Sequence, residues 1–127
     1  MTAPARPMHP ALVYTIDLVL VLAFCALGRG THGEAPIGAG FPATAGPFVV
    51  GLVIGWLVNR FALGGHTASL RSGAVAYAAT LVGGMLLRMA TGQGTAAPFV
   101  IVAAFALAAL LLGWRLVARA VRRSRRA

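Results

Sequence analysis

The sequence predicts an all-helical integral membrane protein, a four-helix bundle built from two parallel-repeat helical hairpins. Of its 127 residues, 59% are hydrophobic and only 10% are charged, which is too little polar surface for a soluble domain of this length. Four apolar stretches are each long enough to cross a bilayer. The motif Thr-Ala-x-Pro-Phe-Val occurs at residues 44–49 and again at residues 95–100, and a Gly-Trp pair follows each copy.

The chain is expected to form a single four-span transmembrane domain over residues 1–127. The second and fourth spans should begin at Pro47 and Pro98, because proline is well tolerated at the first helical position. Residues 29–46 lack a periodic apolar face and are expected to form a loop. The predicted spans are residues 11–28, 47–63, 72–89 and 98–118, followed by a basic cytoplasmic tail at residues 119–127.

The arginines predict the orientation of these spans. With four crossings, Arg6, Arg60, Arg71 and the C-terminal arginines lie on one side of the membrane, and only Arg29 and Arg88 lie on the other. The positive-inside rule makes the first side cytoplasmic. We therefore expect a multi-pass protein of the cell (inner) membrane with both termini in the cytoplasm.

The two Gly-Trp pairs are expected to lie at different depths. Gly55 follows Pro47 by eight residues, whereas Gly113 follows Pro98 by fifteen. Counted from the prolines, the second tryptophan should therefore lie about two helical turns deeper than the first.

Small residues at helical spacing predict where helices approach closely. Without a hydrophobic driving force between helices in lipid, packing relies on such residues. The expected packing positions are Gly51, Gly55, Ala79, Gly83, Ala109 and Gly113.

Asp17 is the strongest single candidate for a functional residue, because a carboxylate inside a span costs on the order of 3 kcal/mol and usually faces the bundle interior. Three interpretations are open. Asp17 forms a structural ion pair, it is a proton or cation site in transport, or it is protonated. The candidate ion-pair partners are Arg60, Arg71 and Arg115.

A second candidate site lies on the opposite side of the membrane. Arg29, His32 and Glu34 follow the first span, and Arg88 should approach them from the end of the third. The guanidinium group of arginine forms bidentate hydrogen bonds with a carboxylate or phosphate. These residues therefore predict a site for an anion or a polar head group. The alternative is that these side chains only extend to the membrane–water interface and form hydrogen bonds within the loop.

The C-terminal arginines predict contact with anionic lipid head groups, and the alternative is a topology anchor. The expected head-group anchors are Arg119, Arg122, Arg123 and Arg126.

Several function classes are not expected. No aromatic and basic surface suits nucleic acid, and no Gly-x-Ser-x-Gly, His-Glu-x-x-His, phosphate-loop or paired-carboxylate pattern occurs. His32 and Glu34 supply at most two metal ligands, and Cys25, the one cysteine, lies in an apolar run. We expect no enzyme, no catalytic residue, no cofactor and no metal.

The chain resembles the prokaryotic membrane family known as domain of unknown function 3054. The resemblance rests on Asp17, Gly28-Arg29 with His32, Pro47-Phe48, the segment Gly84 to Arg88, and Gly113-Trp114-Arg115. It implies a small four-helix membrane protein and supplies no catalytic residues.

The expected function is that of a non-enzymatic accessory or interaction protein, with a homo-oligomer or another membrane protein as partner. The alternative is a small, oligomeric solute or ion transporter or channel that uses Asp17 together with Arg29, His32 and Arg88. A lipid-modifying enzyme that uses His32 and Arg29 ranks third, because Glu34 is the only acid near them.

Overall fold

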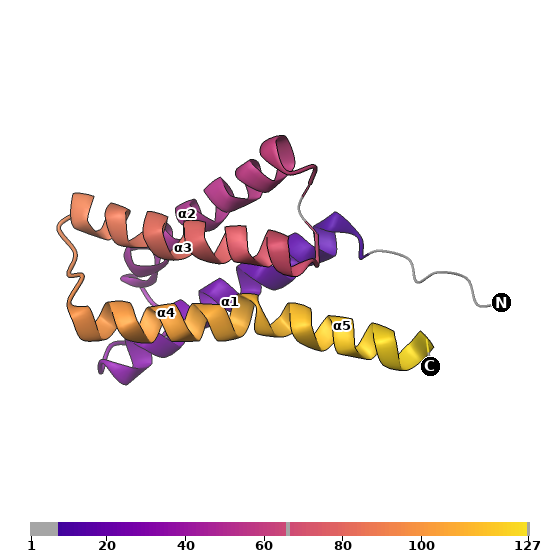
Figure 1. Ribbon diagram of the computed structural model, residues 1–127. Coiled ribbons are helices and arrows are strands. Elements are labelled where there is room, and N and C mark those ends of the chain that lie inside the picture. Colours follow the sequence, from indigo (N-terminus) through magenta and orange to yellow (C-terminus); the bar gives the residue numbers. More distant parts are fainter. Residues whose placement is uncertain (1–7, 66, 127) are drawn as a thin grey trace.

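The computed structural model describes residues 8–65 and 67–126, and every regular element within them is a helix. Four segments are long and apolar enough to cross a membrane, and α4 and α5 together form the fourth. The prediction of an all-helical, four-span membrane bundle is confirmed. The start of α1 and the end of α5 lie at the same end of the molecule (Figure 1). The helices are α1 (Pro10–Thr31), α2 (Phe41–Ala62), α3 (Leu70–Ala90), α4 (Ala97–Leu111) and α5 (Gly113–Arg126).

Local chemistry explains where the helices begin and end. His9 accepts a hydrogen bond from the backbone N–H of Ala11 at 3.1 Å, and Ser69 accepts one from Ser72, so both side chains cap helix N-termini. After α3, Gly92 adopts a φ of 75°, which a residue with a Cβ adopts only with strain. The turn toward α4 therefore depends on glycine at this position.

The start of α2 differs from the prediction. The helix begins at Phe41, six residues before Pro47, so residues 41–46 are helical and the connecting loop is shorter than expected. Pro42 occupies the first turn, where its missing N–H has no helical partner to lose. Pro47 instead lies buried inside α2.

α2 and α3 pack closely through small residues. A Cβ at Gly51 would lie 2.7 Å from the backbone oxygen of Ala79, and a Cβ at Gly83 would lie 3.1 Å from the Cα of Gly51. A Cβ at Gly55 would lie 3.0 Å from the Cα of Ala76. At Gly51 the backbone of α3 leaves no room for a methyl group, and at Gly55 and Gly83 a methyl group would fit only if the neighbouring backbone shifted by a few tenths of an ångström.

The remaining two packing residues were predicted wrongly. Ala109 is exposed, and a Cβ on Gly113 would meet no atom within 4 Å. Gly113 instead follows the single residue, Leu112, that separates α4 from α5.

The core lies between the four spans and joins the two copies of the repeated motif. Phe48 and Phe99, which occupy the same motif position, have ring centroids 6.3 Å apart, and Phe24 packs edge-on against Phe48 at 5.4 Å. Leu52, Leu107 and Leu111 are fully buried around them in a larger apolar cluster.

Candidate functional site

Asp17 and Arg115 form a buried ion pair between the first and last helices. Arg115 NH1 donates to Asp17 Oδ1 at 2.8 Å, and NH2 donates to Oδ2 at 2.9 Å. Both side chains are 0% exposed. This two-pronged geometry is the strongest arrangement available to an arginine and a carboxylate, and it fixes α1 against α5.

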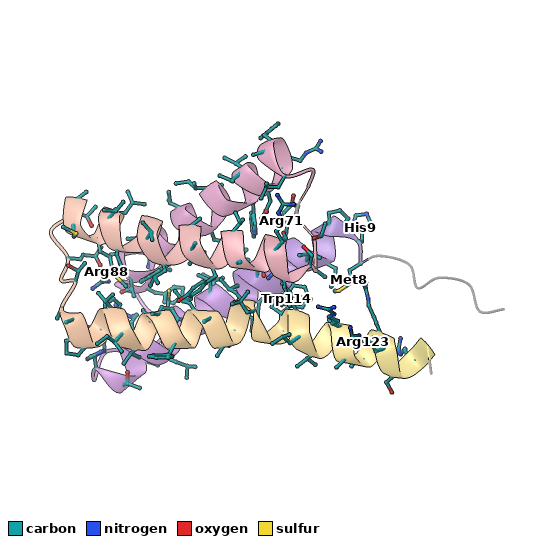
Figure 2. All side chains as sticks on the ribbon, viewed as in Figure 1. Met8, His9, Arg71, Arg88, Trp114 and Arg123 are labelled. Carbon is teal, nitrogen blue, oxygen red and sulfur yellow. The ribbon has the colours of Figure 1, made fainter. Side chains whose placement is uncertain are left out.

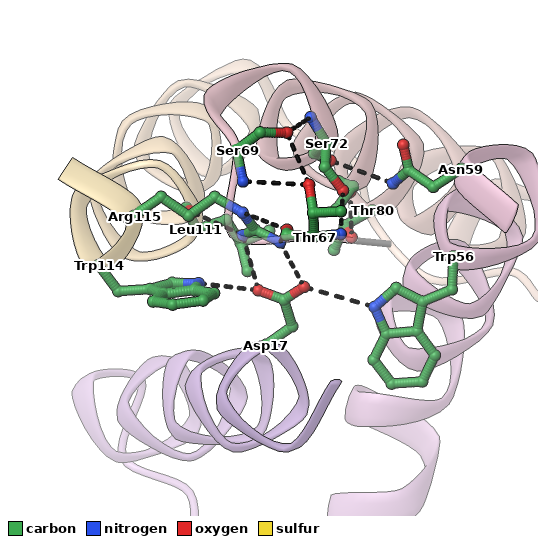
Figure 3. A network of polar contacts seen from close by, with 11 residues as sticks. Asp17, Trp56, Asn59, Thr67, Ser69, Ser72, Thr80, Leu111, Trp114 and Arg115 are labelled. Carbon is green, nitrogen blue, oxygen red and sulfur yellow. Dashed lines mark hydrogen bonds and ion pairs between the residues drawn. The ribbon is translucent and has the colours of Figure 1, made fainter. Parts of the chain in front are cut away.

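Two indole groups complete the surroundings of the same carboxylate. Trp114 Nε1 donates to Asp17 Oδ1 at 2.9 Å, and Trp56 Nε1 approaches Oδ2 at 3.4 Å from the other side (Figure 3). The tryptophans of both Gly-Trp pairs therefore converge on one acid. We call Asp17, Arg115, Trp56 and Trp114 the Asp17 cluster.

The two tryptophans therefore reach one carboxylate, although a two-turn difference in depth was predicted. That prediction was wrong because it was counted from the prolines, and Pro47 is not at a helix start. Counted from the observed N-terminal ends, Trp56 lies 15 residues after Phe41 and Trp114 lies 17 residues after Ala97.

Arg115 is held by further acceptors. Its NH1 donates to the backbone oxygen of Leu111 at 2.8 Å, and its Nε and NH2 donate to that of Thr67 at 3.3 and 3.2 Å. A Cβ at Gly73 would lie 2.5 Å from Arg115 Cδ, so α3 accommodates this side chain only with glycine there. Of the three candidate partners, Arg115 forms the ion pair, whereas Arg60 and Arg71 are exposed.

The other predicted polar residues lie at the opposite end of the bundle, and Figure 2 shows Arg88 at the end remote from Trp114. Arg29, His32, Glu34 and Arg88 line one cavity of about 830 Å³, which we call the Arg88 pocket. Asp17 does not line it. Asp17 therefore lies apart from the other four residues, in keeping with two candidate sites on opposite sides of the membrane.

Arg29 orders the loop that forms one side of the Arg88 pocket. Its NH1 pairs with Glu34 at 2.8 Å and also donates to Thr44 Oγ1 at 2.9 Å. Its Nε donates to the backbone oxygen of Ala35 at 2.8 Å. A Cβ at Gly40 would lie 2.8 Å from Arg29 NH2, so glycine there leaves space for the guanidinium. Much of the hydrogen-bonding capacity of Arg29 is thus used within the protein.

Arg88 has a different environment. Its Nε and NH2 donate to the backbone oxygen of Gly94 at 3.0 and 2.8 Å, and NH1 donates to Gln93 Oε1 at 3.0 Å. Its guanidinium lies 4.5 Å from the centroid of the Phe99 ring. The sequence has only two acidic side chains, and Asp17 and Glu34 pair with Arg115 and Arg29. No acidic side chain therefore neutralises Arg88 in the part of the chain that the structure describes.

Gln93 connects Arg88 to the proline inside α2. Pro47 has no N–H, so the backbone oxygen of Ala43, four residues earlier, lacks its helical donor. Gln93 Nε2 donates to this oxygen at 3.0 Å while its Oε1 accepts from Arg88. One amide thus bonds the backbone oxygen that Pro47 leaves without a donor and also contacts the arginine.

We expect Gln93→Ala to lower the free energy of unfolding by about 1 kcal/mol, because a carbonyl and a guanidinium each lose a partner. In a Pro47→Ala background the restored N–H can bond Ala43, so the cost of Gln93→Ala should fall. Equilibrium unfolding of the two single variants and the double variant measures this coupling. Equal costs in both backgrounds would contradict the role assigned to Gln93.

Residues 14–118 match the family described as protein of unknown function (DUF3054). The chain belongs to this family. The comparisons with curated proteins and with solved structures found no match. The matched range includes the whole Asp17 cluster and the whole Arg88 pocket, whereas Arg119 and the residues after it lie beyond the match.

The residues that the structure describes contain no group of three histidine, cysteine or acidic side chains close enough to hold an ion. The side chains of His32 and Glu34 are exposed at the pocket, and Cys25 is buried at its inner surface.

The sequence analysis did not identify Thr44, Gln93 and Phe99 as pocket residues. It also did not identify the two tryptophans as hydrogen-bond donors to Asp17. The repeated Gly-Trp pair was a usable signal for the tryptophans, because a duplicated polar donor has to find an acceptor when buried. Gln93 had no comparable signal, since its role depends on a proline that lies inside a helix.

Proposed function

We propose that this protein is a non-enzymatic membrane protein that binds an organic anion in the Arg88 pocket. The observation that carries the proposal is Arg88, a cation without an acidic partner among the described residues, on the surface of a cavity of about 830 Å³. Cavities of roughly 300–1,000 Å³ are typical of small-molecule sites.

The charges of the pocket favour an anion. Arg29 and Arg88 contribute two positive charges and Glu34 one negative charge, which leaves a net charge of one positive unit before any protonation of His32. Each guanidinium carries five N–H donors, and three of those on Arg88 are used by Gly94 and Gln93. Its remaining donors can bind a carboxylate or phosphate oxygen.

The apolar side of the pocket favours an anion with a hydrophobic part. Phe24, Phe48 and Phe99 line the cavity together with Cys25 and two alanines. Phe99 lies directly against Arg88, so the apolar and charged surfaces adjoin. An aromatic or short aliphatic anion would place its ring or chain against the phenylalanines and its charge at Arg88.

Association with another protein through small residues receives less support. Gly51, Gly55 and Gly83 form the close contact between α2 and α3 within one chain. A surface of this kind that is already packed cannot also serve a partner helix.

We expect the purified full-length protein to bind phenyl phosphate more tightly than benzyl alcohol, because only the first offers charge to Arg88. Arg88→Gln should weaken binding of phenyl phosphate roughly tenfold or more, since a hydrogen bond to a charged group contributes about 1.5–3 kcal/mol. Calorimetric titration in detergent measures both affinities. Arg60→Gln is the matched control, because Arg60 is exposed and does not line the pocket. Equal affinity for the two compounds, or an unchanged affinity in Arg88→Gln, would refute the proposal.

Transport of the anion is the second candidate function, and the Asp17 cluster is the observation that favours it. The ion pair between α1 and α5 lies toward the end of the bundle opposite the Arg88 pocket, so its opening could connect the pocket with that end. Release of trapped phenyl phosphate from proteoliposomes that contain the wild-type protein, and no release from those that contain Arg88→Gln, would support transport. Binding without release would support a binding function alone.

A further inference from the structure

A second cavity, of about 680 Å³, lies at the end of the bundle opposite the Arg88 pocket, and we call it the α5 pocket. Its surfaces come from α5, from the segment that precedes α3 and from the start of α1. Figure 2 shows Arg123 and Met8 on facing sides at this end of the molecule. The residues that carry its chemistry are Thr67, Ser69, Arg115, Arg119, Arg122 and Arg123.

The α5 pocket is strongly positive. Arg115 is neutralised by Asp17, and the only other acidic side chain, Glu34, bonds Arg29 at the opposite end. Arg119 and Arg123 are exposed, and no acidic side chain of the chain is left to neutralise them. The N-terminal ends of α1 and α3 also border the cavity, and helix N-termini favour anions. The pocket is therefore built for a negatively charged group.

The length of the last span places this pocket at the level of the lipid head groups. A rise of 1.5 Å per residue carries a helix that starts at Ala97 across a hydrocarbon core of about 30 Å by about residue 117. Arg119 and Arg123 then lie roughly 3 and 9 Å beyond the core, where phosphates are found.

The opposite face of α5 supports the same placement. Val117 and Val121 are 64% and 46% exposed on the face away from the pocket, so the helix carries apolar side chains outward there and arginines toward the pocket. By the same rise, Val117 lies at the edge of the hydrocarbon core, where its exposed side chain can contact the acyl chains.

We propose that the α5 pocket binds the phosphate head group of an anionic phospholipid, with Arg119 and Arg123 as its principal ligands. These two residues are four positions apart in the sequence, so their guanidinium groups share one face of α5 and can donate hydrogen bonds to the same phosphate. The proposal does not depend on the Arg88 pocket, which lies at the other end of the bundle.

The test compares lipid retention in two charge-matched double variants of the full-length protein. Arg119→Gln/Arg123→Gln removes the proposed ligands, and Arg60→Gln/Arg125→Gln removes two exposed arginines that do not line the pocket. Each protein is incubated with phosphatidylglycerol or phosphatidylcholine in detergent, and native mass spectrometry counts the bound lipid. Thermal unfolding of both variants verifies that they are folded, as expected for exposed positions.

We expect the wild-type protein to retain phosphatidylglycerol in preference to phosphatidylcholine. Each arginine near the membrane surface changes affinity for anionic lipid about fivefold, so loss of both ligands should lower retention about 25-fold. The control variant should stay within about twofold of the wild type.

Three results would overturn the proposal. Equal losses in the two variants would show that overall charge, not the pocket, holds the lipid. Equal retention of the two lipids would show that the head-group charge is not recognised. Displacement of phosphatidylglycerol by millimolar inorganic phosphate would identify a soluble phosphate as the occupant.

Discussion

Asp17→Asn should lower the free energy of unfolding by about 3–5 kcal/mol, because it leaves the charge of Arg115 buried without compensation. Both side chains are 0% exposed, and the pair joins α1 to α5. Unfolding with sodium dodecyl sulfate in mixed micelles, followed through tryptophan fluorescence, measures the loss. Trp56 and Trp114 both bond this carboxylate, so the signal comes from the site itself.

Two further variants make this result specific. Asp17→Leu/Arg115→Met removes both charges and should recover more than half of the lost stability, because replacing a whole buried ion pair is far less harmful than breaking it. Glu34→Gln breaks the ion pair with Arg29 and should cost less than about 1 kcal/mol, because the Glu34 side chain is 57% exposed. An Asp17→Asn protein as stable as the wild type would instead favour a proton or cation role for Asp17.

The second large effect is expected at the contact between α2 and α3. Gly51→Ala should destabilise the protein by about 1–3 kcal/mol, because its methyl group would meet the backbone of α3. A Cβ there would lie 2.7 Å from the oxygen of Ala79 and 3.1 Å from the nitrogen of Gly84, and neither atom can rotate away as a side chain would. The same unfolding experiment measures the change.

Gly46→Ala is the matched control on the same helix. A Cβ at Gly46 would meet no atom within 4 Å, and alanine is favoured over glycine in a helix by about 1 kcal/mol. The two alanine variants should therefore differ in sign, with Gly46→Ala neutral or stabilising. Two variants of equal stability would show that the helices are farther apart than the structure places them.

The four spans were predictable because the bilayer requires about 20 apolar residues for each crossing, and few other constraints produce such runs. The predicted ends of the third span, 72–89, differ from α3 (Leu70–Ala90) by two residues or fewer. Asp17 and Arg115 were also predictable as a candidate pair, since a carboxylate in a span needs a partner and few arginines lie at a suitable depth. Choosing Arg115 over Arg60 and Arg71 required the structure, because helix rotation decides which arginine faces inward.

The region around Pro47 could not be predicted from the sequence. The rule that proline starts a helix applies to both Pro42 and Pro47, and the preceding loop gave no apolar periodicity to choose between them. The predicted depth of Trp56 also followed from taking Pro47 as the start of the helix. The role of Gln93 depends on it too, because the oxygen it bonds is free only when Pro47 lies inside the helix.

The candidate site was predicted in part. Arg29, His32, Glu34 and Arg88 do line one cavity, but sequence spacing could not show that Glu34 neutralises Arg29 and not Arg88. This difference decides which arginine is available to an anion. It depends on the course of a loop through Ala35 and Gly40, which no helical or strand periodicity describes.

The buried pair also sets an order of events during biosynthesis. Asp17 emerges from the ribosome 98 residues before Arg115, so the first helix must enter the bilayer while its acid has no counter-ion. Every nascent or truncated chain that stops short of Arg115 therefore lacks the partner of this acid. The carboxylate and the guanidinium can pair only after Arg115 has been synthesised.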